Sequence, residues 1–203
     1  NIDFNDLDGL VKALDGIEIV YHLGAIADAS LAYKNYKLTF DVNVIGTYNV
    51  LEACRINNVK KIIYSSTIWV YNAADVSEVN EETLFTNNTQ HVYTTTKFFG
   101  EYLCYDFANM YNLDFTILRF GIPYGPGSEF NVIPIFIRRA LNKESLTIRG
   151  SGEQKRQFIF VKDLAGGCVS AISNKADNGI FNLADNEMIS VKQVANTVSA
   201  LIP

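Results

Sequence analysis

The sequence has few of the residues that build metal centres, disulfide frameworks and nucleic-acid surfaces. Its 203 residues include three cysteines and two histidines, all far apart, so neither a metal-ligand spacing nor a disulfide framework is present. The net charge is −5 and the basic residues are dispersed, which argues against a nucleic-acid partner. No apolar run approaches the ~20 residues of a membrane span. These absences predict a soluble cytoplasmic protein without a metal.

The overall composition is that of a folded globular protein. Hydrophobic residues make up 48% of the chain and charged residues 19%, and no low-complexity tract occurs, which argues against disorder. The length suits one domain or slightly more, enough to bury a core.

Apolar runs alternate with helical periodicity over the first 120 residues. We expect helices at 7–14, 43–58 and 93–111 and strands at 17–23, 60–67 and 114–120. Apolar strands alternating with helices favour a parallel sheet covered on both faces. Beyond a turn-rich loop we expect a helix at 133–142, strands at 146–149 and 158–161, a helix begun by Asp163, and a last helix started by a Ser190–Gln193 capping box.

The chain enters this alternation without a first strand and without a glycine-rich turn. The glycines at 121, 125 and 127, and those at 150 and 152, do not lie between a strand and a helix start. They therefore do not form a dinucleotide fingerprint, and structural roles in loops are favoured for them.

One pair of side chains suggests chemistry. Tyr93 and Lys97 are four residues apart on an expected helix, so the phenol and the ammonium share a face. The spacing alone is weak, because Tyr33 and Lys37 match it as well, and we interpret that second pair as a solvated loop or helix face. Tyr93 and Lys97 differ in following a buried strand that ends in hydroxyls at Thr67. A phenol beside a cation and a third hydroxyl is a plausible proton-transfer device.

Taken in order, seven stretches resemble the extended short-chain dehydrogenase/reductase family, the NAD-dependent sugar-nucleotide epimerases and dehydratases. These stretches are 3–6, 22–25, 43–47, 65–71, the Tyr93/Lys97 dyad, 118–126 and 150–163. Each is weak to moderate alone, but their common order and spacing along nearly the whole chain are specific.

The resemblance implies an α/β fold with an incomplete Rossmann-like, doubly wound parallel sheet and a smaller α+β substrate-binding region. The implied NAD-binding domain is 1–121 with 158–178, and the implied substrate-binding region is 122–157 with 179–203. The resemblance also implies that the phosphate-binding turn precedes residue 1 and that part of the substrate domain follows residue 203. We therefore expect the 203-residue chain alone to bind NAD weakly or not at all, which calorimetry tests.

The resemblance also implies roles for single residues. Tyr93 would act as the base, Lys97 would support it, and Thr67 would orient the sugar oxygen. A tyrosine working as a base near neutrality needs its pKa lowered by ~3 units, roughly 4 kcal/mol. The implied NAD contacts are Asp3, Phe4, Leu23, Gly24, Ala25, Asn43, Ser65, Tyr93, Lys97 and Phe120. The implied substrate contacts are Thr67, Ile122, Val132 and Arg156, with Arg156 on the diphosphate.

Structural roles compete with some of these functional ones. Thr67 could simply bond the backbone at a strand end, and Arg156 could be a surface residue. For Asp163 a helix cap is favoured over a substrate contact.

Departures from the family pattern narrow the activity. Family dehydratases carry Asp-Glu after the catalytic Thr and decarboxylases keep a Glu there, whereas this chain has Ile68 and Trp69. Dehydration and decarboxylation are therefore disfavoured, which leaves epimerisation or reduction of a ketosugar. Of these we expect an epimerase similar to UDP-hexose 4-epimerases, working through a transient keto intermediate. The alternatives are a dehydratase, decarboxylase or ketoreductase of the same family, or a non-catalytic binding module. Ile122 replaces an Asn that many members place on the substrate, which leaves the sugar and nucleotide open.

The family resemblance also implies a homodimer built from the helices at 43–58 and 93–111. The second helix has more apolar surface than one buried face needs, in agreement with this expectation. The residues concerned are Phe98, Phe99, Tyr102, Leu103 and Tyr105.

Overall fold

The computed structural model describes residues 2–74, 78–85, 87–89, 91–129 and 131–202. The chain forms two compact units. Unit 1 comprises Asn1–Arg119 and Cys168–Asn182, and unit 2 comprises Phe120–Gly167 and Leu183–Pro203. None of the described helices is long and apolar enough to cross a membrane.

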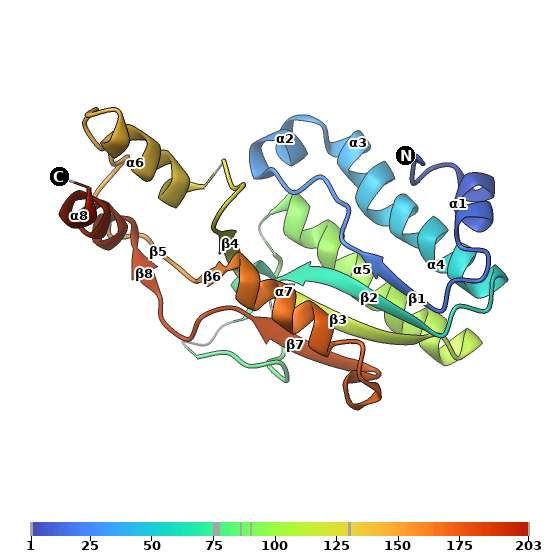
Figure 1. Ribbon diagram of the computed structural model, residues 1–203. Coiled ribbons are helices and arrows are strands. Elements are labelled where there is room, and N and C mark those ends of the chain that lie inside the picture. The colour runs from blue at the N-terminus through green and yellow to red at the C-terminus, as the bar shows by residue number, and fades with distance from the viewer. Residues whose placement is uncertain (1, 75–77, 86, 90, 130, 203) are drawn as a thin grey trace. The chain divides into compact units, whose positions relative to one another are not determined.

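Unit 1 is built on a four-stranded sheet with the strand order β1-β2-β3-β7 (Figure 1). The strands are β1 (Ile19–His22), β2 (Lys61–Thr67), β3 (Asp114–Phe120) and β7 (Gly179–Leu183). The helices are α1 (Leu7–Ala13), α2 (Ala29–Lys34), α3 (Tyr36–Phe40), a π-helical turn (Asp41–Ile45), α4 (Gly46–Ile56), a 3-10 helix (Ile68–Ala73), α5 (Val92–Tyr111) and a 3-10 turn (Asn174–Ala176). β1 pairs in parallel with β2, from Ile19 opposite Lys61 to His22 opposite Tyr64. The predicted parallel α/β sheet is confirmed.

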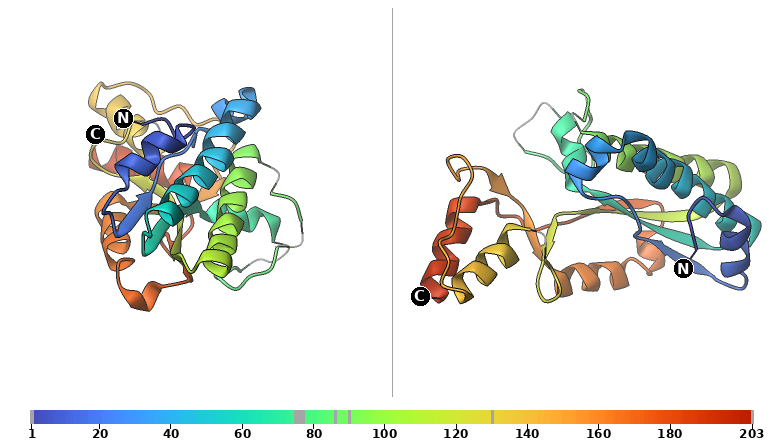
Figure 2. Two further views of the ribbon diagram at one scale, coloured as in Figure 1. Left: turned by 90° about the vertical axis from the view of Figure 1, so that its right-hand side faces the viewer. Right: turned by 90° about the horizontal axis from the view of Figure 1, so that it is seen from above.

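β2 forms the centre of this unit, because all seven of its residues are buried. The helices α4 and α5 lie side by side, with α5 packed against β2 and α1 against α4 (Figure 2). The apolar core between sheet and helices includes Leu51, Ile62, Tyr64, Phe107 and Ile117. Residues 62–67 carry no charge, and they lie in a strand that is covered on both faces.

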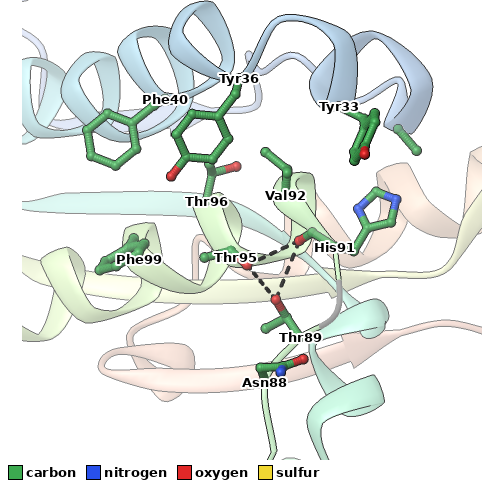
Figure 3. Close-up of a pocket in the computed structure, with 11 residues that line it drawn as sticks. Tyr33, Tyr36, Phe40, Asn88, Thr89, His91, Val92, Thr95, Thr96 and Phe99 are labelled. Atoms are coloured by element: carbon green, nitrogen blue, oxygen red, sulfur yellow. Dashed lines mark hydrogen bonds between the residues drawn. The ribbon is translucent and has the colours of Figure 1, made fainter.

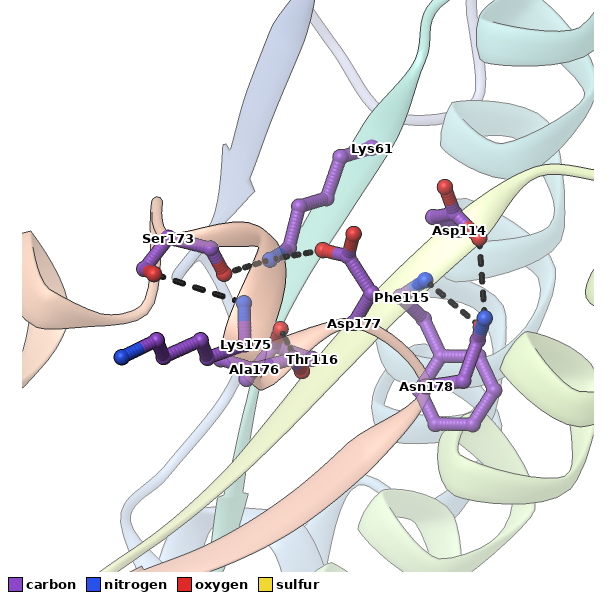
Figure 4. A network of polar contacts seen from close by, with 9 residues as sticks. All are labelled: Lys61, Asp114, Phe115, Thr116, Ser173, Lys175, Ala176, Asp177 and Asn178. Atoms are coloured by element: carbon purple, nitrogen blue, oxygen red, sulfur yellow. Dashed lines mark hydrogen bonds and ion pairs between the residues drawn. The ribbon is translucent and has the colours of Figure 1, made fainter.

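Polar side chains join β7 to the sheet at the amino ends of β2 and β3 (Figure 4). The buried Lys61 ammonium contacts the Asp177 carboxylate at 2.6 Å and donates to the Ser173 carbonyl at 3.1 Å. Asn178 donates to the Asp114 carboxylate at 2.8 Å, and the Thr116 hydroxyl donates to the Ala176 carbonyl at 2.7 Å; these two bonds lie beside the ion pair. The turn before β7 is thereby fixed to its neighbouring strands.

Local signals in the sequence explain several helix ends. Asp6 caps α1 by accepting a hydrogen bond from the Gly9 amide at 2.9 Å. α5 ends at Asn112, whose φ of 53° is left-handed and stops the helix. Ser190 and Gln193 form the predicted capping box at the start of α8.

Unit 2 contains two small sheets. β4 (Ile122–Tyr124) pairs in parallel with β6 (Phe158–Phe160), and β5 (Lys155–Arg156) pairs antiparallel with β8 (Ile189–Ser190). Its helices are α6 (Val132–Leu141), α8 (Val191–Leu201) and most of α7 (Val161–Ser170), which ends in unit 1. α6 and α8 pack together around Phe136, Phe158 and Val194.

Several expectations from the sequence need correction. The segment 146–149 is irregular rather than a strand, although Leu146 and Ile148 do face the core of unit 2. α7 begins at Val161, so Asp163 lies in its first turn and is not its cap. The helix expected at 43–58 continues a helical path that starts at α3 and passes through the π-helical turn. The segment Gly179–Leu183, expected in the substrate-binding region, is a strand of the four-stranded sheet.

Candidate active site

The carboxyl end of β2 carries three consecutive hydroxyls, two of which bond side chains of α5. Ser65, Ser66 and Thr67 are all buried, and all three have hydrogen-bond partners. In open α/β sheets, ligands bind beyond the carboxyl ends of the strands. This edge of unit 1 is therefore where a reactive group is expected.

Lys97 brings a buried cation to this edge. Its side chain is 2% exposed, its ammonium donates to the Ser65 hydroxyl at 3.4 Å, and it lies 4.6 Å from the centroid of the Tyr64 ring. Burial lowers the pKa of Lys97 to about 7, against the opposing effect of Cys104 and Glu101. A lysine with this pKa changes its charge near neutrality, which suits a proton-transfer site.

Tyr93 lies one turn before Lys97 on α5 and is half-buried. Its ring is edge-to-face with Trp69 at 6.3 Å and with His91 at 6.4 Å between centroids. Burial raises the pKa of Tyr93 to about 12, so the phenol is protonated in this structure. Use of Tyr93 as a base near pH 7 therefore requires positive charge close to its oxygen.

Thr67 ends β2, and its hydroxyl accepts a hydrogen bond of 3.3 Å from the Trp69 amide, at the start of the 3-10 helix. This backbone contact is the structural role that competes with a catalytic one. The hydroxyl hydrogen is still available to a second partner. The orienting role of Thr67 remains a prediction.

A cavity of about 360 Å³ adjoins the start of α5 (Figure 3). Tyr33, Tyr36 and Phe40 line it from α2 and α3, opposite residues of α5. Thr95 donates to the His91 carbonyl at 3.2 Å and also bonds the Thr89 hydroxyl, which fixes the turn that leads into Tyr93. The competing Tyr33/Lys37 pair is split between α2 and α3, and Tyr33 is 80% exposed, as expected for a solvated pair.

Asn43 joins the loop after β1 to α5. Its carboxamide accepts from the Ile26 amide at 2.8 Å and donates to the Ile26 carbonyl at 3.1 Å and to the Thr96 hydroxyl at 3.0 Å. The Thr47 hydroxyl donates to the Asn43 carbonyl at 2.6 Å, so it accepts from His22 Nε2 at 2.9 Å. Burial, with the charge of Lys97, lowers the pKa of His22 to about 3 and keeps its ring neutral.

The residues near the start of the chain that are proposed to contact NAD differ in how far they are exposed. Asp3 is exposed, and its carboxylate accepts from the Asn5 amide at 2.9 Å. Phe4 packs its ring edge-to-face on His22 at 5.2 Å and covers Gly24, where an added Cβ would lie 2.3 Å from the ring. Leu23 is half exposed, and Gly24 and Ala25 are half-buried. Gly24 therefore has a packing reason to be glycine.

Four of the expected contact residues belong to unit 2. Phe120, Ile122 and Val132 are half-buried there, whereas Arg156 is exposed and donates to the neighbouring Lys155 carbonyl at 2.8 Å. Their contacts with cofactor or substrate remain predictions.

A buried ion pair, which the sequence did not predict, lies next to the candidate site. Glu101 and Arg119 are 3% and 2% exposed and form a two-pronged contact, with Arg119 Nε and one terminal nitrogen 3.0 and 2.7 Å from the carboxylate oxygens. One signal was available: Glu101 follows Lys97 by four residues, so both lie on the same face of α5.

Comparisons with known proteins show which family this chain resembles. Residues 1–184 match the family model described as the NAD dependent epimerase/dehydratase family. A UDP-N-acetyl-alpha-D-glucosaminuronate decarboxylase of Bacillus cytotoxicus is 31% identical over 98% of this chain and 63% of its own length. A putative UDP-glucose 4-epimerase of Methanocaldococcus jannaschii is also 31% identical, over 95% of this chain and 63% of its own length.

Solved structures show the same likeness. The UDP-N-acetylglucosamine 4-epimerase of Methanobrevibacter ruminantium, in complex with UDP-N-acetylmuramic acid, is 32% identical with a TM-score of 0.88, over 98% of this chain and 65% of that one. The UDP-glucuronic acid 4-epimerase of Bacillus cereus, in complex with UDP-glucuronic acid and NAD, is 29% identical with a TM-score of 0.88, over 98% and 64%.

This chain thus spans a little under two thirds of the length of these relatives, and they include both epimerases and a decarboxylase. The predicted Rossmann-like fold is confirmed. The match over residues 1–184, which includes Thr67, Tyr93 and Lys97, shows that this chain belongs to the NAD-dependent epimerase/dehydratase family.

Proposed function

We propose that this chain carries the catalytic centre of an NAD-dependent epimerase that acts on a nucleotide-diphosphate sugar and resembles UDP-hexose 4-epimerases. The observation that carries the proposal is the buried Lys97 ammonium, one helical turn from Tyr93 and bonded to the end of the strand that carries Thr67.

NAD, when bound, supplies a hydride acceptor and donor together with a positive charge on its nicotinamide ring. The residues present fit such a ligand. Within the described chain, the buried Lys97 ammonium has only one long hydrogen bond, to Ser65, and so retains donors for ligand oxygens such as ribose hydroxyls. Leu23 is exposed on the loop after β1, where a cofactor could lie along the backbone.

Tyr93 would remove the proton from a sugar hydroxyl while Thr67 holds the same oxygen. Lowering the pKa of Tyr93 from about 12 to near 7 requires about 7 kcal/mol of preferential stabilisation of the phenolate. Protonated Lys97 would supply part of it as a nearby opposite charge, and a bound cation the remainder. Arg156 would bind the diphosphate through its guanidinium fork.

The side chains after Thr67 favour epimerisation over elimination. Ile68 and Trp69 carry no acid, and the Trp69 ring packs against His91 and Tyr93, where it covers the base with an apolar surface. The decarboxylase among the relatives makes decarboxylation the second candidate.

The reaction products distinguish these activities. The complete natural polypeptide that carries this chain should be incubated with UDP- and dTDP-hexoses and hexuronates in D₂O. An epimer of unchanged mass and without deuterium on carbon supports the proposal, because the hydride that leaves the sugar returns to it. Loss of water indicates a dehydratase and loss of CO₂ a decarboxylase, and either one as the sole product would overturn the proposal.

We also propose a homodimer in which α4 and α5 supply the interface. Phe99, Tyr102 and Tyr105 are exposed on α5, as is Tyr48 on α4. Phe98 and Leu103, which we expected at the same surface, instead pack inward: Phe98 against Phe85, and Leu103 on the core. Sedimentation at micromolar concentration should show a dimer that Tyr102→Glu dissociates, and a wild-type monomer would contradict it.

A further inference from the structure

The buried ion pair between Glu101 and Arg119 is placed where it can act on the candidate active site. Glu101 lies one turn beyond Lys97 on α5, and Arg119 lies at the carboxyl end of β3. Arg119 donates to both carboxylate oxygens, at 3.0 and 2.7 Å. Burial alone would lower the pKa of Arg119, but its hydrogen bonds to Glu101 and the charge of Glu101 raise it, so Arg119 stays charged.

The pair also holds the strand that carries Thr67. The Ser66 hydroxyl donates to the same Glu101 oxygen that Arg119 Nε contacts. Alternation along β2 directs Tyr64 and Ser66 toward α5, and the Tyr64 hydroxyl donates to the Lys97 carbonyl at 3.2 Å. Glu101 and Tyr64 therefore fix α5 to β2 on either side of Ser65, the hydrogen-bond partner of Lys97.

Arg119 extends these contacts to the 3-10 helix that follows Thr67. It donates to the Tyr71 hydroxyl at 2.9 Å, and Tyr71 in turn donates to Asn182 of β7 at 2.8 Å. The guanidinium lies 5.1 Å from the Tyr71 ring centroid and 5.3 Å from that of Phe85. Thr67 thus lies between two segments that the ion pair holds.

The charge of Glu101 acts on Lys97 along the helix. Of the two groups that oppose the effect of burial on the Lys97 pKa, Cys104 is neutral near pH 7 because burial raises the pKa of its thiol well above the usual range. Glu101 is then the one that carries charge. The other titratable or charged groups on elements packed against α5 are Tyr33, Lys34, Tyr36, Lys37, Asp41, Tyr48, Glu52, Cys54, Arg55, Lys61, Tyr64 and Tyr71, and the neighbouring strands add His22 and Arg119.

We propose that Glu101, held by Arg119 and Ser66, is a positioning residue of the active site, which holds Lys97 against the end of β2 and places a carboxylate one turn along α5 from it. A buried ion pair is rarely more stabilising than apolar side chains of the same size. A gain in stability therefore does not account for this pair, whereas a role at the active site does. The inference rests on the proposed function for its effect on turnover, but not for its effect on Lys97.

The first test uses the chain itself and needs no substrate. In protein labelled with ¹³C-lysine, the Cε shift of Lys97, assigned by its loss in Lys97→Met, reports the titration of the ammonium. Glu101→Gln should lower its midpoint by about 1 pH unit. Asp177→Asn breaks the ion pair at the other end of β2 and should leave the midpoint unchanged. An unchanged midpoint in Glu101→Gln would overturn the electrostatic part of the proposal.

The second test uses turnover by the complete natural polypeptide. Ser66→Ala keeps the ion pair but removes its bond to β2, and should lower kcat roughly tenfold with little change in KM, together with a fall in Tm. Asp177→Asn should lower Tm at unchanged kcat, which separates the loss of positioning from the loss of stability. A Ser66→Ala enzyme with the kcat and pH profile of the wild type would overturn the positioning role. If the wild type has no turnover, the proposed function fails, while the Lys97 titration still decides the inference.

Discussion

An ion pair lies at each end of β2, and the two pairs differ in burial and in what they contact. At the amino end, Lys61 and Asp177 join the strand to the turn before β7, among backbone and carboxamide groups (Figure 4). At the carboxyl end, Glu101 and Arg119 bond Ser66 and Tyr71, which flank Thr67 in the sequence.

This difference indicates that the amino end of β2 serves stability and that its carboxyl end also serves the chemistry. The amino-end pair closes a structural turn, and Asp177 reaches solvent with about a quarter of its side chain exposed. The carboxyl-end pair is almost wholly buried beside a lysine whose pKa burial lowers to about 7. We therefore expect substitutions at the amino end to change the free energy of unfolding alone, and substitutions at the carboxyl end to change the chemistry as well.

The largest expected effect is on turnover. Tyr93→Phe in the complete natural polypeptide should lower kcat by about 10²–10⁴-fold, because the base is removed while the ring packing is kept. Tyr111→Phe is the matched control, since Tyr111 is an exposed tyrosine at the opposite end of α5, and it should keep the wild-type rate. Equal rates for the Tyr93→Phe variant and the wild type would contradict an active site at the carboxyl end of β2.

The next effect concerns the carboxyl-end pair. Glu101→Leu should lower the free energy of unfolding by about 3–5 kcal/mol, because it leaves the Arg119 guanidinium buried without a counter-charge. Glu101→Leu combined with Arg119→Leu should recover most of that loss. Urea unfolding of the three chains measures both values, and a double variant no more stable than the single one would refute this account of the pair.

A smaller effect is expected where α5 rests on β2, between the two ends. A Cβ added at Gly100 would lie 2.1 Å from the Tyr64 hydroxyl, in a fully buried contact. Gly100→Ala should therefore destabilise the chain by about 1–3 kcal/mol in thermal unfolding. Gly166→Ala on α7, where the added Cβ meets nothing within 4 Å, should not destabilise the chain. Equal behaviour of the two variants would contradict the close packing of α5 on Tyr64.

The smallest expected effect is at the amino end. Asp177→Asn should lower the free energy of unfolding by about 1–2 kcal/mol, because Lys61 keeps its bond to the Ser173 carbonyl and Asp177 is partly solvated. The kcat of the complete polypeptide should not change. A drop in kcat at constant stability would contradict the claim that the amino end affects stability alone.

Local patterns in the sequence were sufficient for the elements that position the site. The apolar run of β2 and the shared face of Tyr93 and Lys97 depend on spacing along a single segment, and so does the capping box at Ser190. These features follow from the periods of strands and helices, which a sequence displays directly.

The contacts between segments could not be predicted in the same way. The Glu101–Arg119 pair joins residues 18 positions apart on a helix and a strand, and the sequence shows neither their pairing nor their burial. The segment 146–149 alternates like a strand because Leu146 and Ile148 face a core, but alternation does not supply a partner strand. The rise in the Tyr93 pKa likewise results from burial under Trp69 and its neighbours.

The pH dependence of stability tests most directly whether Lys97 is a buried cation that changes its charge near neutrality. Its pKa is about 7 in the folded chain against 10.5 in the unfolded one, so the unfolded state binds more protons between these values and stability should rise with pH there. Compared with Lys97→Met, the wild-type chain should gain ~4 kcal/mol in the free energy of unfolding between pH 7 and pH 10. Parallel curves for the two proteins across this range would contradict the account.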